Sequence, residues 1–213
     1  MANGLEEGQT SGAASADYAD LPQEAREVLD CWFGVPGAAE FGTERKIWFS
    51  RNAAFDAMLR ERFGALIDSA RESALDSWTQ TPLGALALVI VLDQFSRNCH
   101  RDTARAFAAD QKALHIAQQM VASGADRLLP TVQHRAFAYL PFEHDETLES
   151  QRESLRLFKE LEAEPGGKSY YRSAVRHAEI IERFGRFPHR NAPLGRPSTA
   201  EEIAFLRTPG SSF

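Results

Sequence analysis

The chain has 213 residues, of which 43% are apolar and 25% are charged. A chain of this length buries roughly two-thirds of the surface that its unfolded form exposes, so neither disulfides nor structural metals are needed for a stable core. Asp and Glu outnumber Lys and Arg by 30 to 24, giving a net charge of -6. This charge excludes nucleic acid and anionic membranes as partners of the surface as a whole, unless one face gathers the cations.

The two cysteines, Cys31 and Cys99, form no C-x-x-C motif or disulfide framework, which favours reduced thiols in a cytoplasmic protein. The first residues lack the basic and apolar regions of a secretory signal. The longest apolar run, residues 83–92, reaches about half of a membrane span. We therefore expect a soluble, cytoplasmic protein with neither membrane nor nucleic acid as a partner.

Residues 1–20 are rich in Gly, Ala, Ser and acidic residues, which predicts a flexible N-terminal tail. Residues 21–213 are predicted to form a single all-α domain. Apolar residues recur at helical spacing in several stretches, which end at Gly34, Gly124, the Pro165-Gly pair and Gly185. A capping box at Ser198 and Glu201 predicts a short last helix.

The run at residues 83–92 fits either a buried helix or a buried parallel strand, because periodicity alone does not separate the two. Thr81 and Pro82 form a good cap and first turn, and the chain offers no other β-branched runs with which to build a sheet. We therefore predict a helix, apolar on all sides, at the centre of the domain.

A dense polar cluster follows this run. Asp93 and Arg97 lie one helical turn apart, as do Gln94 and Asn98, and Arg101 comes one turn after Arg97. A carboxylate that emerges from a core helix must be paired or hydrogen-bonded. The functional interpretation is a rigid guanidinium that binds an anionic ligand, and the alternative is a structural ion pair.

Residues 183–196 combine four arginines and a histidine with the helix breakers Gly185, Pro188, Pro193 and Gly195. The breakers predict a loop, which suits recognition. The side chains expected to bind a phosphate or carboxylate are Arg186, His189, Arg190, Asn191 and Arg196. In the structural alternative, these side chains neutralise the carbonyl groups at helix C-termini and pair with acidic residues on the surface.

Residues 139–146 contain Pro141, where a break is expected, and an acidic cluster around His144. His144 and His189 are candidates for general acid or base. Asp145 is the expected N-cap of the next helix. The histidines show no ligand spacing, so no metal site is predicted.

Cys99 lies among Arg97, Asn98, His100 and Arg101, so a nucleophilic thiol and a semi-buried, inert one are both considered. The serine-hydrolase elbow, the P-loop and the dinucleotide fingerprint are absent from the sequence, and no cofactor is predicted.

Several motifs occur in an ordered series, namely VLDCWFG (28–34), LDQFSRN (92–98), ARAF (104–107), YLPF (139–142), FGRFPHRN (184–191) and LGR (194–196). Together they resemble the bacterial domain-of-unknown-function family 924. The resemblance covers nearly everything after the tail and implies an all-helical fold of the tetratricopeptide-like superfamily, with no established activity. Ser96 stands where the family more often has proline, and Glu143 and Asp145 also depart from its pattern, which argues against a special role for either acid.

Three functions are compatible with these residues. The first is a helical protein that binds an anionic small molecule or an acidic peptide in a pocket formed around Arg97, His144 and Arg190. The second is a hydrolase or transferase that acts on such an anion, with His144 or His189 as acid or base and Arg97, Arg186 and Arg190 stabilising developing charge. The third is a structural scaffold in which the charges pair with one another. The sequence does not specify the oligomeric state.

Overall fold

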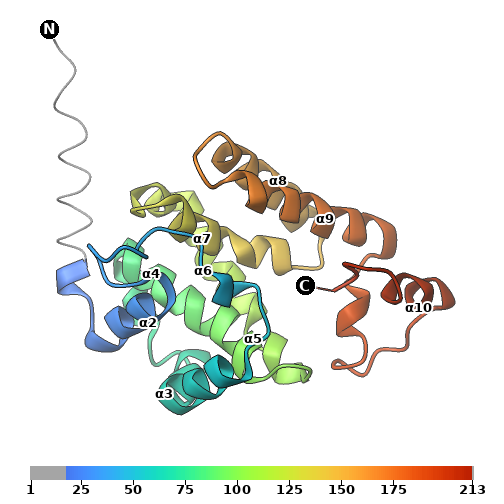
Figure 1. Cartoon of the computed structure of the whole chain (residues 1–213), viewed down its shortest axis with the longest axis horizontal. Coiled ribbons are helices and arrows are strands. Elements are labelled where there is room, and N and C mark those ends of the chain that lie inside the picture. The colour runs from blue at the N-terminus through green and yellow to red at the C-terminus, as the bar shows by residue number, and fades with distance from the viewer. Residues whose placement is uncertain (1–17, 213) are drawn as a thin grey trace, which may run out of the picture.

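The computed structural model describes residues 18–212, and every regular element among them is helical (Figure 1). The main helices are α2 (Gln23–Phe33), α3 (Ala53–Arg71), α4 (Pro82–Val89), α5 (Ser96–Cys99), α6 (Asp110–Ser123), α7 (Val132–His144), α8 (Leu148–Glu162), α9 (Lys168–Phe184) and α10 (Ala200–Leu206). The short helical turns are η1 (Lys46–Trp48), η2 (Asp76–Gln80), η3 (Ile90–Phe95), η4 (Ala104–Phe107), η5 (Ala125–Leu128) and η6 (Pro188–Arg190). The predicted all-α fold is confirmed.

The predicted tail, residues 1–20, lies outside the described residues except for its last three. Residues 18–20 are helical, and the Tyr18 hydroxyl donates a hydrogen bond to the carboxylate of Asp30 in α2. The start of the folded part therefore lies a few residues earlier than the composition suggested, because Tyr18 supplies an aromatic side chain that packs against the core.

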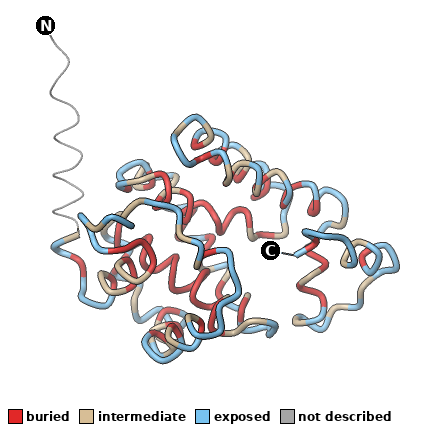
Figure 2. The backbone as a smooth tube through the Cα atoms, viewed as in Figure 1, coloured by how far each residue is buried: buried red, intermediate tan, exposed pale blue. Residues whose placement is uncertain are grey.

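The central helix, residues 82–99, consists of α4, η3 and α5 in one continuous run. Thr81 caps its start by accepting a hydrogen bond from Gly84 N, and Pro82 occupies the first helical position. All of its residues from Leu83 to Ser96 are buried, and they form the red run through the middle of Figure 2. The helix prediction for residues 83–92 is confirmed, and the competing strand prediction is wrong.

Gly84 lets the preceding turn pack closely on the central helix. A Cβ atom at this position would lie 2.2 Å from the carbonyl oxygen of Trp78 in η2. No side chain other than hydrogen fits at that distance. The close approach helps to bury Trp78 against the start of the helix.

The middle of the central helix, η3, is a π-helical turn. The backbone stays right-handed on both sides, at Val89 and Ser96, so the turn widens the helix without breaking it. A π-turn holds one residue more than an α-turn, and such turns occur frequently at functional sites. Here the widened turn carries Asp93 and Gln94.

Amphipathic helices surround the central helix and contribute an aromatic core. The ring of Trp32 in α2 lies 5.7 Å from Phe95 and 5.6 Å from Phe137 in α7, measured between ring centroids. Trp48 of η1 lies 4.8 Å from Phe137. Aromatic pairs at these separations contribute about 0.5–1.5 kcal/mol each beyond their buried area. The core therefore joins α2, η1 and α7 to the central helix.

The C-terminal segment, which follows α9, has its own small apolar cluster. Ile180, Ile181 and Phe187 are buried together, with Phe184 and Phe205 packed against them. Gly185 ends α9 with a left-handed backbone (φ 67°). The segment lies at the end of the domain opposite α2 (Figure 1).

Three local predictions are corrected by one to three residues. The capping box of α10 is formed by Thr199 and Glu202, rather than Ser198 and Glu201. Pro141 does not break the chain but lies inside α7, which continues to His144. The N-cap of α8 is Thr147, while Asp145 accepts hydrogen bonds from the Thr147 backbone and hydroxyl. Packing of the apolar face of α7 outweighs the hydrogen bond that proline removes.

No helix within residues 18–212 combines the length and the apolar character that crossing a bilayer requires. Helices α7, α8 and α9 are consecutive neighbours in space (Figure 1). A tetratricopeptide-like arrangement of the whole chain stays a prediction.

We expect Leu88→Ala to lower the free energy of unfolding by about 2–5 kcal/mol, because the Leu88 side chain is fully buried in the central helix. Urea denaturation measures the change. The control is Leu128→Ala, since Leu128 is 66% exposed and its truncation should change stability little. Equal effects of the two substitutions would place the central helix outside the core.

His134 predicts a loss of stability in mild acid. It stacks on Phe33 with ring centroids 4.0 Å apart, and burial lowers its pKa to about 3. Below the ordinary pKa of 6.5 the unfolded chain binds a proton that the folded chain does not bind. As the pH is lowered from 6.5 to about 3, this residue should therefore reduce the free energy of unfolding by about 1.4 kcal/mol per pH unit.

Urea denaturation of the wild type and of His134→Gln between pH 4.5 and 6.5 tests this expectation. The variant should show a shallower slope of stability against pH, whereas His115→Gln, at an exposed position, should keep the slope of the wild type. The same slope in all three proteins would show that His134 is protonated in the folded state.

Candidate functional site

The three polar segments singled out in the sequence meet in space. Asp93 of the central helix contacts Arg97 of the same helix and His144 at the end of α7, and Asp110 at the start of α6 connects Arg97 to Arg190 of η6. We call these five residues, Asp93, Arg97, Asp110, His144 and Arg190, the central cluster. Helix ends position all of them except Asp93 and Arg97, which the π-turn and the helix after it carry.

Asp93 is the buried centre of this cluster. Its Oδ1 accepts from His144 Nδ1 at 2.7 Å and lies 2.9 Å from Arg97 Nη1, while Oδ2 accepts from Gln94 Nε2 at 2.6 Å. Burial alone would raise the pKa of Asp93, but the charge of Arg97 and the contacts with His144 and Gln94 outweigh it. The pKa lies well below its ordinary value, so Asp93 is an anion near neutral pH.

Asp110 links the two arginines. Arg97 donates two hydrogen bonds to its carboxylate, at 2.8 and 2.9 Å, and Arg190 Nη1 donates one at 3.2 Å. The ring of Phe107 lies under both guanidinium groups, with centroid distances of 5.6 Å to Arg97 and 4.8 Å to Arg190. The two cations therefore share one carboxylate and one aromatic face.

The carboxylates compensate the two arginines unequally. Arg97 contacts both Asp93 and Asp110, and their charges raise its pKa despite burial. Arg190 is 7% exposed, and burial together with the charge of Arg97 lowers its pKa to about 10. Its Nε has no hydrogen-bond partner among the described residues. Arg190 is thus the less compensated cation of the cluster.

His144 is held in one tautomer. An ionised carboxylate only accepts hydrogen bonds, so Nδ1 of His144 must carry the proton that points to Asp93. Burial, followed by the charge of Arg97, lowers the pKa of His144, which keeps the ring neutral near pH 7. Nε2 is then an acceptor.

His189, the second candidate acid or base, lies beside the central cluster. Its ring is 5.7 Å from Phe187, and burial followed by the charge of Arg190 lowers its pKa to about 3. At neutral pH the ring is neutral, so it is not in the protonated form that a general acid requires. A His189 role in binding or catalysis stays a prediction.

Sequence reasoning missed several residues at this place. Asp110 and Phe107 were not candidates, because an acidic residue in the first turn of a helix is already accounted for by the helix dipole. His177 was not a candidate either, and it pairs with Glu143 at 2.9 Å while its ring lies 6.3 Å from that of His144. No sequence signal places two carboxylate–histidine pairs side by side.

Asn98 and Arg101 do not join the central cluster. Both bind Asp56 of α3, Asn98 at 2.8 Å and Arg101 at 2.6 and 3.1 Å. Asn98, in the last turn of the helix, and Arg101, just after it, therefore pair with α3 rather than with the central cluster. Between them lies Cys99, and burial raises the pKa of its thiol to about 11, so the nucleophile hypothesis loses its chemical basis.

Arg186, Asn191 and Arg196 form a third group within the C-terminal segment. Arg186 binds Glu202 at 2.6 and 2.8 Å. Arg196 binds Glu146 at 2.6 and 2.9 Å and donates to Asn191 Oδ1 at 3.0 Å. Carboxylates of the chain therefore occupy both guanidinium groups. The Arg186–Glu202 ion pair lies within the C-terminal segment, and the Arg196–Glu146 ion pair connects the segment to the loop that precedes α8.

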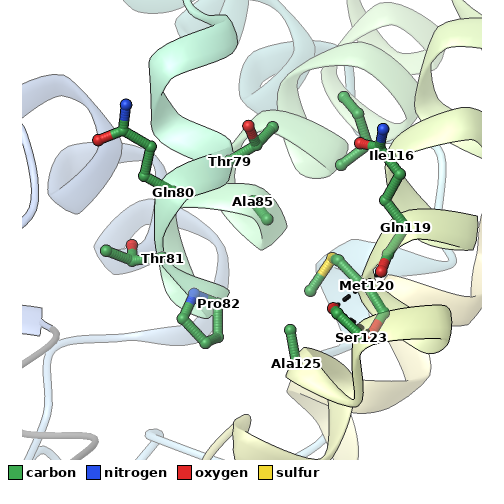
Figure 3. Close-up of a pocket in the computed structure, with 10 residues that line it drawn as sticks. All are labelled: Thr79, Gln80, Thr81, Pro82, Ala85, Ile116, Gln119, Met120, Ser123 and Ala125. Carbon is green, nitrogen blue, oxygen red and sulfur yellow. Dashed lines mark hydrogen bonds between the residues drawn. The ribbon is translucent and has the colours of Figure 1, made fainter.

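A surface pocket of about 200 Å³ lies at the other end of the central helix (Figure 3). Its walls come from η2 and the start of α4 on one side and from α6 and η5 on the other, and Gln80 and Gln119 are among its lining residues. None of its lining residues is charged or belongs to the central cluster. Within residues 18–212 no three His, Cys, Asp or Glu side chains are arranged to hold a metal ion.

Comparison with known proteins gives the same picture of an unassigned function. Residues 28–210 match the family described as "Bacterial protein of unknown function (DUF924)". The chain is also similar to a solved structure of a protein of unknown function, ATU0120 from Agrobacterium tumefaciens, with 36% sequence identity and a TM-score of 0.74. The similarity covers 86% of this chain and 96% of the other. No curated protein matches.

The central cluster predicts a large effect of Asp93→Asn on stability. The neutral amide leaves the buried Arg97 with one carboxylate fewer, and its own NH2 group faces a donor of either Gln94 or His144, so the free energy of unfolding should fall by about 3–5 kcal/mol. The matched control is Asp102→Asn, whose carboxylate is 70% exposed beside Arg51 and should contribute about 0–1 kcal/mol. Similar urea midpoints for both variants would contradict the central place of Asp93.

Proposed function

Because the chain belongs to the DUF924 family, whose description assigns no activity, we propose its function from the site alone: the central cluster binds an anionic small molecule or an acidic peptide end. The ligand group is a carboxylate or phosphate that takes hydrogen bonds from Arg97 and Arg190. Guanidinium groups match both anions in shape and charge. The remaining candidate residues, Asn98, Arg101, Arg186, Asn191 and Arg196, support the fold around this place.

The incomplete compensation of Arg190 carries the proposal. A buried cation needs charge and hydrogen bonds to replace its lost hydration. Arg190 has one carboxylate oxygen at 3.2 Å and no partner for Nε among the described residues. An anion at its side would supply what is lacking.

The site has an exposed edge through which an anion can enter. The side chains of Arg97, Asp110 and His144 are 19%, 14% and 14% exposed. These three residues contact one another or Asp93, so their partly exposed side chains lie close together. Phe107 forms an apolar wall beneath both guanidinium groups, which strengthens charge interactions by excluding water.

The structural scaffold is the competing function, and a specific observation supports it. Most charges of the cluster pair within the chain, two carboxylates with two guanidinium groups. In a pure scaffold, Arg190 would be required for stability. In a binding site, its replacement would leave the fold nearly as stable, because its own compensation is weak.

Thermal melting in the presence of phosphate, citrate or acetate tests the proposal. At constant ionic strength, set with sodium chloride, a binding anion should raise the Tm of the wild type with its concentration. Arg190→Gln should melt near the wild type and lose the anion effect. Arg183→Gln removes an exposed arginine paired with Glu201 and should keep the effect.

The opposite pattern would support the scaffold. In that case Arg190→Gln removes one of the two buried cations that balance Asp93 and Asp110, and it lowers the free energy of unfolding by about 3–5 kcal/mol. No anion would then change the Tm of the wild type beyond the effect of sodium chloride.

A further inference from the structure

We infer that the ligand of the central cluster is a hydroxy acid, whose hydroxyl group donates a hydrogen bond to Nε2 of His144 while its acidic group binds Arg97 and Arg190. The inference rests on the proposed function and names the chemical class of its ligand. It follows from the hydrogen-bonding capacity that the cluster leaves unused.

The His144 ring is fixed in orientation and in tautomer. Asp93 Oδ1 accepts from His144 Nδ1 at 2.7 Å and also contacts Arg97 at 2.9 Å. The carboxylate is therefore fixed from two sides, and it fixes the imidazole in turn. A histidine that donates from Nδ1 and is neutral carries a lone pair on Nε2.

The surroundings of Nε2 leave its lone pair available to a ligand. This atom lies on the side of the ring opposite the one that faces Asp93, and it forms no hydrogen bond with another residue in the range 18–212. The ring is 14% exposed. The side chain thus presents an acceptor, without a partner from the chain, at the edge of the cluster.

Two buried cations, Arg97 and Arg190, lie near His144. The positive charges of Arg97 and Arg190 both act on His144 and oppose its protonation. They are opposed by Asp93, the carboxylate in direct contact with the ring. His144 therefore stays a hydrogen-bond acceptor near two positively charged guanidinium groups.

These features define a complementary ligand. The arginines need anionic oxygens, and Nε2 needs an O–H or N–H donor. A simple carboxylate or phosphate dianion satisfies only the arginines and brings a negative oxygen towards a lone pair. A carboxylate with a hydroxyl group on the neighbouring carbon offers both kinds of group, an anion for the arginines and an O–H donor for Nε2.

Matched ligand pairs test the inference without knowledge of the physiological ligand. Malate differs from succinate, and citrate from tricarballylate, by one hydroxyl group. Calorimetric titration of the wild type should show each hydroxy acid binding about tenfold more tightly than its partner, the effect of one hydrogen bond at a partly exposed site.

His144→Asn is the diagnostic variant, because the asparagine amide can still donate to Asp93 but has no group in the place of Nε2. It should bind succinate about as well as the wild type and lose the preference for malate. His115→Asn replaces an exposed histidine of α6 and should keep the preference.

Nuclear magnetic resonance of the ring nitrogens provides a second measurement on the wild type, independent of how the variant folds. His144 should show the neutral tautomer with the proton on Nδ1, and malate should shift its Nε2 resonance while succinate does not. Equal affinities within both pairs, or a proton on Nε2, would overturn the inference and leave anion binding intact. Absence of binding by all four acids would instead overturn the proposed function.

Discussion

A carboxylate in the middle of an apolar helix imposes the arrangement of everything around it. Asp93 has no contact with solvent, and an ionised group in that position must be surrounded by cations and donors or it takes up a proton. Arg97 and Gln94 come from the same helix, but His144 comes from α7. Arg97 in turn needs Asp110, and Asp110 connects to Arg190. Three helices and the C-terminal segment are thus joined by one chain of charge compensation.

The C-terminal segment depends on polar contacts more than the rest of the domain does. Its apolar cluster has three fully or nearly buried residues, whereas the main core spans residues from Leu21 to Ala174. Glu146 binds both the backbone N–H of Phe187 and the guanidinium of Arg196, and Asp110 binds Arg190. The site and the attachment of this segment therefore use the same kind of interaction, which explains why a binding role and a scaffold role are so closely related here.

Local rules accounted for much of the fold. The apolar run with its Thr81 and Pro82 start, and the glycine at the end of α9, depend on a few neighbouring residues, and the structure has them where the sequence placed them. The predicted break at Pro141 was wrong because tertiary packing held α7 together. Spacing along a helix put Asp93 and Arg97 together, but Asn98 and Arg101 went to Asp56, since the partner on α3 is set by how the helices pack. The tertiary partners Asp110 and Asp56 could not be identified from spacing.

The π-turn at residues 90–95 determines where in this helix a residue can be gained or lost. It contains one residue more than an α-helix of the same span, so the segment behaves as if a single codon had been inserted into a regular helix. Deleting that extra position would restore an unbroken α-helix and leave the later side chains in nearly their present directions, because the wider turn already absorbs the extra residue. A deletion in the α-helical turns before the π-turn would instead rotate Arg97, Asn98 and Arg101 by about 100°, away from their partners Asp110 and Asp56. The π-turn is therefore the place in this helix where the loss of one residue would change the contacts of the later side chains least.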